Sequence, residues 1–256
     1  MIRRPLAAAA VLALLAGVTA CGRLGMTRTA SGDAAERAQL SQVAEPPQRL
    51  IAPPPGPHSL LVAALGDSIT AGTPQWDPNP AIRATIDPGI LDSHNQWEYW
   101  AGRRNGRLAF RNCGVEGDRT DQLATRLASC AFGAEVIVIQ GGLNDIAQGR
   151  TPQEAERNLR AMVRHAKRLE IAVVTVEVLP WNGADRLETQ RIRDLNRLIR
   201  TIGRAENVPV LLWYRALEDP RAPGRMCAGL TSDGEHPSVA GQEILGALFR
   251  VPPLTP

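Results

Sequence analysis

The stretch Leu60-Leu61-Val62-Ala63-Ala64-Leu65-Gly66-Asp67-Ser68 decides the fold of this chain. It opens with six consecutive apolar residues and has no polar face, a pattern typical of a strand buried on both sides within a parallel sheet. The polar turn that follows marks the carboxyl end of this strand. Ligands bind at that end of open parallel sheets, so Asp67 and Ser68 are expected to lie at a functional site.

Further apolar runs and helical patterns continue downstream. Residues 136–139, 171–176 and 208–213 are continuous apolar runs, 108–110 is a shorter candidate strand, 151–154 have the residues of a helical capping box, and 239–249 are a candidate closing helix. Strands that alternate with helices predict an α/β protein with a three-layer α/β/α sandwich around a five-stranded parallel sheet and right-handed crossovers.

The N-terminal segment, residues 1–20, has the features of an export signal: Arg3 and Arg4 precede an apolar run that is too short to span a bilayer comfortably. Cys21 directly follows Val18-Thr19-Ala20, which resembles the lipobox of bacterial lipoproteins, whose cysteine carries the lipid. An extracytoplasmic protein anchored to the cell membrane by lipid alone is therefore expected. The alternative is secretion after an ordinary cut at Ala20, without lipidation of Cys21.

Composition divides the mature chain into a tether and one domain. Residues 21–57 are polar and then proline-rich, which predicts a disordered tether, while 58–250 are long enough for a single domain and 251–256 form a tail. The chain has 29 basic and 26 acidic residues; without Arg3 and Arg4 the balance is 27 − 26 = +1. Such a small net charge argues against nucleic-acid binding. A monomer is expected.

Four short blocks carry the residues of a chemical site, and each follows an expected strand. They are Gly66-Asp67-Ser68, Gly114-Val115-Glu116-Gly117-Asp118, Gly142-Leu143-Asn144-Asp145 and Asp233-Gly234-Glu235-His236-Pro237. A serine, an imidazole and a carboxylate can together perform nucleophilic catalysis at neutral pH. The four histidines have no metal-ligand spacing, so no metal and no cofactor are expected.

These blocks resemble those of the SGNH hydrolases, also called the GDSL esterase/lipase family. The similarity runs from about residue 60 to 250 and covers Gly66-Asp67-Ser68-Ile69, Asn112 to Gly117, Gly142 to Asp145 and Asp233 to Pro237. It implies a flavodoxin-like fold with Ser68 as nucleophile, His236 as general base and Asp233 as the residue that orients it. It also implies oxyanion donors from the Ser68 and Gly117 backbones and the Asn144 side chain; Gly114 is expected to be a turn glycine.

The resemblance implies a serine esterase that cleaves carboxylic esters through an acyl-serine intermediate. An O-acetylesterase acting on carbohydrate or peptidoglycan, and an acyltransferase, share the same blocks. A non-catalytic, glycan-binding envelope lipoprotein is the alternative from another class. The α/β-hydrolase fold is disfavoured, because its nucleophile elbow needs Gly-x-Ser-x-Gly and the residue at that last position is Thr70.

Aromatic residues outside the blocks are candidates for contacts with a small-molecule or glycan ester. Trp76, between the first two blocks, and Trp181, after the fourth strand, are each predicted to line the substrate pocket, with packing as the alternative. Trp97 and Trp100 are expected to pack in the core.

An exported protein can form disulfides, and Cys113, Cys130 and Cys227 belong to the expected domain. A helix of about ten residues should carry Cys130 about 15 Å from Cys113, towards the other end of the sheet. A Cys113–Cys227 disulfide is therefore predicted, with three free thiols as the alternative.

Overall fold

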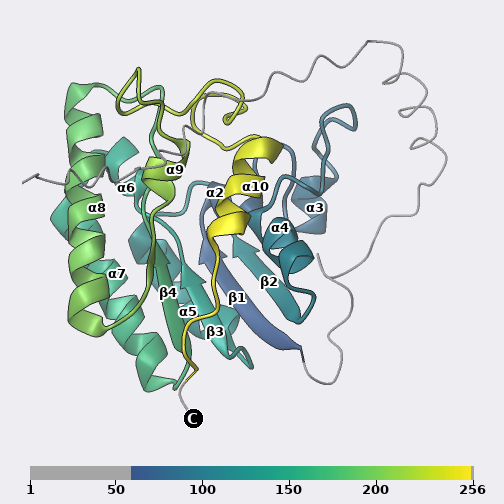
Figure 1. The fold of residues 1–256 in the computed structure, drawn as a ribbon, viewed down its shortest axis with the longest axis vertical. Helices are drawn as coiled ribbons and strands as arrows, with labels where there is room; N and C mark the ends of the chain where they lie inside the picture. The colour runs from purple at the N-terminus through teal and green to yellow at the C-terminus, as the bar shows by residue number, and fades with distance from the viewer. Residues whose placement is uncertain (1–58, 255–256) are drawn as a thin grey trace, which may run out of the picture.

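A five-stranded parallel sheet forms the centre of the computed structural model, which describes residues 59–254 (Figure 1). Its strands, in the spatial order β2-β1-β3-β4-β5, are β1 (Leu60–Gly66), β2 (Leu108–Gly114), β3 (Val136–Ile139), β4 (Ala172–Val176) and β5 (Val210–Leu211). All four neighbouring pairs are parallel. This is the flavodoxin-like order, so the predicted fold class is confirmed. The predicted export signal, lipidation site and tether lie outside the described residues.

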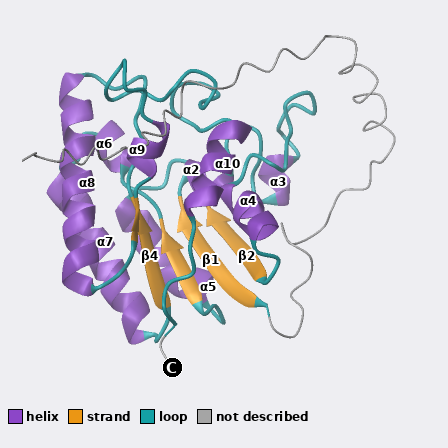
Figure 2. Ribbon diagram, in the orientation of Figure 1, coloured by secondary structure: helices purple, strands orange, loops and turns teal. Residues whose placement is uncertain are grey.

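Helices cover both faces of the sheet (Figures 1 and 2). They are α2 (Ser68–Ala71), α3 (Pro80–Arg83), α4 (Trp97–Arg104), α5 (Thr120–Ala131), α6 (Leu143–Ala147), α7 (Pro152–Arg168), α8 (Arg186–Glu206), α9 (Trp213–Leu217) and α10 (Val239–Leu248). In Figure 1, α4 and α10 pack together in front of the sheet, whereas α5 and α7 lie behind it. None of the described helices combines the length and apolar character needed to cross a bilayer.

The capping box predicted from residues 151–154 begins α7. Glu154 accepts a hydrogen bond from the Thr151 N–H at 2.8 Å, while the Thr151 hydroxyl accepts one from the Glu154 N–H at 3.3 Å. Pro152 occupies the first helical turn, where its missing N–H is not needed. The local sequence therefore fixes the start of this helix.

The fifth strand is much shorter than the apolar run 208–213 predicts. Only Val210 and Leu211 pair with β4, and Trp213 begins α9. The strand lies at the sheet edge and starts after Pro209, which has no N–H to donate. Trp213 instead packs in the core against Trp97, with ring centroids 5.6 Å apart. Trp97 is buried as expected, whereas Trp100 is only partly buried and lies outside the core.

Candidate active site

The strand register brings three of the four blocks to one edge of the sheet. Gly66 at the end of β1 lies opposite Gly114 at the end of β2, and Leu65 lies opposite Ile139 at the end of β3. The chain turns in opposite directions from β1 and β3, which makes their carboxyl ends the topological switch point. The loops after these strands therefore lie next to one another, at the position where open parallel sheets bind their ligands.

The nucleophile candidate opens a four-residue helix, α2. Asp67 is its N-cap, and its carboxylate accepts a hydrogen bond from the Ile69 N–H at 3.0 Å. The Asp67 N–H donates to Gln140 Oε1 at 3.1 Å, so both ends of this residue are fixed. Burial raises the pKa of Asp67 to about 6, although the Ile69 and Gln140 contacts oppose this effect. Ser68 is thereby held in one backbone geometry.

Gly114 is not the simple turn glycine that the sequence predicts. A Cβ at this position would lie 2.1 Å from the backbone nitrogen of Ala71, a residue of α2. Because no side chain fits there, the end of β2 can approach the nucleophile helix directly. Gly117 has the positive φ, +78°, and open space around its Cα.

The C-terminal block reaches Ser68 across 168 sequence positions. His236 Nε2 lies 3.0 Å from Ser68 Oγ, and His236 Nδ1 lies 2.7 Å from Asp233 Oδ2. Burial acts to raise the pKa of Asp233, but the hydrogen bonds from the His236 N–H and ring and from the Glu235 N–H outweigh it and lower the pKa below its ordinary value. Asp233 is thus a stable anion beside the imidazole.

Asn182, which the sequence patterns do not single out, supports the loop that carries Asp233 and His236. Its N–H donates to the Gly234 carbonyl at 2.7 Å, and its side-chain oxygen accepts from the Met226 N–H at 2.6 Å. Trp181 precedes it, and this partly buried side chain packs against the core. The predicted substrate-binding residue Trp181 therefore lies in the loop that contacts the acid–base segment.

Three donors are available near this edge of the sheet for a developing negative charge. Within the described part of the chain, no acceptor contacts the backbone N–H of Ser68 or of Gly117. Asn144 donates one side-chain N–H to the Asp118 carbonyl at 3.1 Å, which leaves its second N–H for another acceptor. Among residues 59–254, no group of three or more possible ligands is arranged to hold a metal.

Trp76, the other predicted substrate contact, lies beside the end of α2. A Cβ on Gly72, the C-cap of that helix, would lie 3.1 Å from Trp76 Cβ. The Arg83 guanidinium covers the indole at 4.5 Å from the ring centroid, and the side chain is partly buried. This tryptophan is therefore anchored next to the nucleophile helix.

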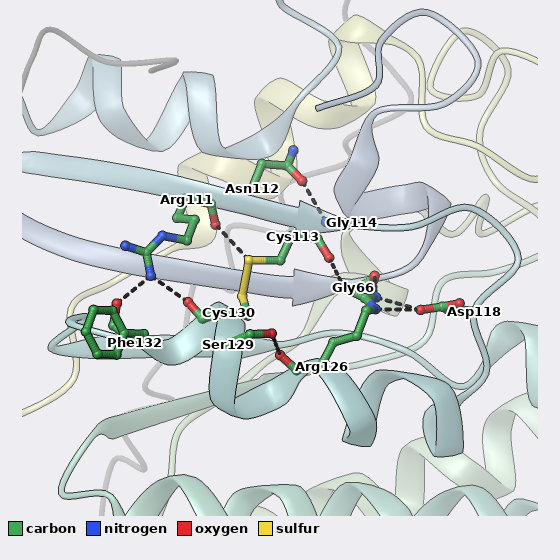
Figure 3. Close-up of a disulfide and its surroundings, with 10 residues drawn as sticks. All are labelled: Gly66, Arg111, Asn112, Cys113, Gly114, Asp118, Arg126, Ser129, Cys130 and Phe132. Atoms are coloured by element: carbon green, nitrogen blue, oxygen red, sulfur yellow. Dashed lines mark hydrogen bonds and ion pairs between the residues drawn. A yellow bond between two sulfur atoms is a disulfide. The ribbon is translucent and has the colours of Figure 1, made fainter. Parts of the chain in front are cut away.

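The predicted Cys113–Cys227 disulfide is wrong, because Cys113 pairs with Cys130, with Cα atoms 6.0 Å apart (Figure 3). The physical reason is the position at which α5 begins. Arg126, midway along α5, still donates hydrogen bonds to the carbonyls of Gly66 and Cys113 at the ends of β1 and β2. Helix α5 therefore starts beyond the sheet edge, and its length only brings Cys130 back level with Cys113.

Comparison with protein-family models identifies the family of this chain. The model of the GDSL-like Lipase/Acylhydrolase family matches residues 64–244, and the chain belongs to that family. It is thus a serine hydrolase of the SGNH type that acts on ester bonds. A search among curated proteins finds no match to this sequence.

Solved structures with the same fold include lipolytic proteins from several bacteria. A G-D-S-L family protein from Desulfitobacterium hafniense is 21% identical with a TM-score of 0.61, covering 74% of this chain and 97% of its own. A GDSL-like lipase from Bacteroides thetaiotaomicron is 21% identical (TM-score 0.57; 84% and 93% covered). A lipase/acylhydrolase from Enterococcus faecalis is 25% identical (TM-score 0.58; 74% and 92% covered).

Proposed function

We propose that this protein is an exported serine esterase that hydrolyses carboxylic esters through an acyl intermediate on Ser68. The observation that carries the proposal is the pair of contacts of His236, whose Nε2 is 3.0 Å from Ser68 Oγ and whose Nδ1 is 2.7 Å from Asp233. A serine hydroxyl is a weak nucleophile unless a base within hydrogen-bond reach accepts its proton. This geometry supplies that base in its required orientation.

The first half of the reaction acylates the enzyme. As Ser68 Oγ bonds to the ester carbonyl carbon, its proton passes to His236 Nε2, and the anionic Asp233 stabilises the imidazolium. The tetrahedral intermediate collapses when the bond to the alkoxy group breaks, and the imidazolium returns the proton to the leaving alcohol. In the second half, a water attacks the acyl-serine with His236 again as base, which releases the acid and restores Ser68.

Oxygen carries negative charge in both tetrahedral intermediates, and the backbone N–H groups of Ser68 and Gly117 and the Asn144 amide are proposed to bind it. Among the described residues, no acceptor contacts the N–H groups of Ser68 and Gly117, and Asn144 uses only one of its two side-chain N–H groups, which supports this role. Removing one such donor typically costs about 3 to 4 kcal/mol of transition-state stabilisation. Gly117 has a positive φ, a backbone conformation that residues with a side chain rarely adopt, which explains why a glycine occupies this position.

Trp76 and Trp181 are proposed to contact the substrate, as a small-molecule ester or an acylated glycan. Trp76 adjoins the end of α2, and Trp181 precedes Asn182, which bonds to the acid–base loop. The two indoles would thus flank Ser68 from different loops. Localisation outside the cytoplasm, with a lipid on Cys21 as the membrane anchor, is a further part of the proposal and rests on the N-terminal sequence.

Hydrolysis of nitrophenyl esters from acetate to palmitate tests the activity and reports the preferred chain length. We expect Ser68→Ala to lose at least about 10³-fold in kcat/KM on the best ester. Ser129→Ala is the matched control, since this exposed serine bonds only within α5. Acetylated xylan and O-acetylated peptidoglycan, with and without an alcohol acceptor, separate O-acetylesterase and acyltransferase activity from simple esterase activity. An inert parent that binds glycan would instead indicate a binding lipoprotein.

A further inference from the structure

We infer that Gln242 is a positioning residue that fixes the distance between Ser68 and His236, an inference that rests on the proposed function. Gln242 belongs to α10, and its side chain is fully buried. Its Nε2 donates a hydrogen bond at 3.1 Å to the carbonyl of Ile69, the residue directly after the nucleophile. The bond therefore joins α10 to α2 next to the reacting hydroxyl.

Helix α2 depends on such outside donors because of its length. Among the carbonyls of Ser68, Ile69 and Thr70, only that of Ser68 accepts a helical hydrogen bond, from the Gly72 N–H at 3.0 Å. Amide side chains donate to the carbonyls of Ile69 and Thr70, and also to the carbonyl of the C-cap residue Gly72. Gln242 bonds to the Ile69 carbonyl, Asn112 to that of Thr70 at 2.7 Å, and Asn95 to that of Gly72 at 2.8 Å. Each amide comes from a different part of the chain, so the position of α2 is set by its neighbours.

Gln242 differs from the other two amides because its helix continues directly from the acid–base segment. Ser238, two residues after His236, is the N-cap of α10, and its carbonyl accepts the Gln242 N–H at 2.8 Å. The Ser238 N–H donates to the Leu230 carbonyl at 3.0 Å, which fixes the start of the helix. Little backbone freedom remains between His236 and Gln242.

Two hydrogen bonds therefore close a ring between the two ends of the domain. On one side His236 Nε2 meets Ser68 Oγ, and on the other Gln242 Nε2 meets the Ile69 carbonyl. The second bond joins α10 and α2 directly, so its loss removes one of the contacts that keep Ser68 and His236 in register. Displacements of about 1 Å in such contacts can reduce turnover about 100-fold.

The side-chain oxygen of Gln242 indicates that this residue does more than stabilise the fold. Its Oε1 is buried and has no hydrogen-bond partner among the described residues. An unpaired buried acceptor is unfavourable, so a methionine at this position would lose one bond and also remove one unpaired atom. Methionine would, however, leave the Ile69 carbonyl without its donor, so the contact with α2 requires the amide.

The test compares Gln242→Met with the parent and with Asn196→Leu. Asn196 is a matched control because it is also a buried amide that bonds to backbone, namely to the N–H and the carbonyl of Val178, but it lies on α8 and makes no hydrogen bond to α2. We expect Gln242→Met to lower kcat about 10- to 100-fold with KM within about threefold, and to slow phosphonylation of Ser68 by a small fluorophosphonate equally. Asn196→Leu should lower the melting temperature and keep the parental kcat.

Several outcomes overturn the inference. A parental kcat for folded Gln242→Met would do so, as would an equal loss of kcat in Asn196→Leu. Gln242→Asn, whose amide is one methylene too short to reach Ile69, should reproduce the loss if the methionine variant does not fold; failure of both to fold would assign Gln242 to the fold instead. If the parent protein has no esterase activity, the proposed function itself is wrong. If the parent is active, Ser68→Ala is inactive and Gln242→Met keeps the parental kcat, only this inference is wrong.

Discussion

Asp233 holds His236 through both of its carboxylate oxygens. Oδ1 accepts the backbone N–H of His236 at 2.8 Å, and Oδ2 contacts the ring Nδ1 of the same residue at 2.7 Å. The carboxylate therefore fixes the backbone turn and the ring together. This double contact explains how three residues of separation suffice to orient the imidazole.

Asp233→Asn should lower kcat/KM about 10²- to 10⁴-fold, because an amide can neither stabilise the imidazolium nor enforce the correct ring tautomer. The initial rate on the preferred nitrophenyl ester is the measurement. Asp219→Asn is the control, since Asp219 likewise accepts a backbone N–H two residues on, from Arg221, in an exposed loop. Equal activities of the two variants would contradict the role of Asp233.

Asn144→Ala should lower kcat about 10²- to 10³-fold with little change in KM, because its free N–H is proposed to act mainly in the transition state. Steady-state kinetics over a range of substrate concentrations separates the two constants. The control is Asn158→Ala on α7, which removes an asparagine that bonds to the Thr120 hydroxyl at 3.0 Å. A change confined to KM would instead indicate ordinary substrate binding by Asn144.

Asp67→Asn should change how stability depends on pH. The folded pKa of about 6 exceeds the ordinary value of 3.8, so the parent binds this proton more tightly when folded, and the associated stability is lost as pH rises from about 4 to 6. The shift corresponds to about 3 kcal/mol. Relative to the parent, the variant should gain about that much between pH 4 and pH 7 in urea unfolding. A constant difference across this range would contradict the shifted pKa.

Replacement of both Cys113 and Cys130 by serine should lower the free energy of unfolding by about 3 kcal/mol, as expected for a disulfide that closes a loop of this size. Denaturant unfolding with and without reductant measures the effect on the parent and the variant. Non-reducing peptide mapping should recover a Cys113–Cys130 peptide, and a peptide that joins Cys113 to Cys227 instead would refute the pairing.

Cys21→Ala should move the protein from the membrane fraction to the soluble extracytoplasmic fraction, because we propose that a lipid on Cys21 anchors it to the membrane. Cell fractionation followed by detergent phase partition measures this distribution. Ser129→Ala, at an exposed position of α5, provides a control for a single substitution. Unchanged membrane association of the Cys21 variant would contradict the lipoprotein assignment.

The parts of the structure that local sequence determines could be predicted. Strands β1, β3 and β4 are recognisable because burial on both faces requires unbroken apolar runs, and the Thr151 cap begins α7 as its residues indicate. The meeting of Ser68 with His236 is what the resemblance of the four blocks to those of the SGNH hydrolases implies. The number of residues between Ser68 and His236 does not by itself indicate that they meet.

Features that depend on how far one helix or strand is shifted along another could not be predicted from the sequence. The pairing of Cys113 with Cys130 depends on where α5 begins relative to the sheet edge, and the shortness of β5 depends on its neighbours. Asn182 and Gln242 act through hydrogen bonds to backbone groups that are distant in the sequence. Such amides have no sequence pattern that separates them from surface residues, so only coordinates reveal them.

All five strands of the described sheet are complete by Leu211, while the imidazole that contacts Ser68 arrives with residue 236. A polypeptide that stops between these points would contain every strand of the sheet and its serine but not the His236 that accepts its proton. During synthesis, the strands and the nucleophilic serine are therefore made before the residue that activates the serine. A nascent chain that ends before residue 236 is therefore expected to lack esterase activity, although its sheet and its serine are already complete.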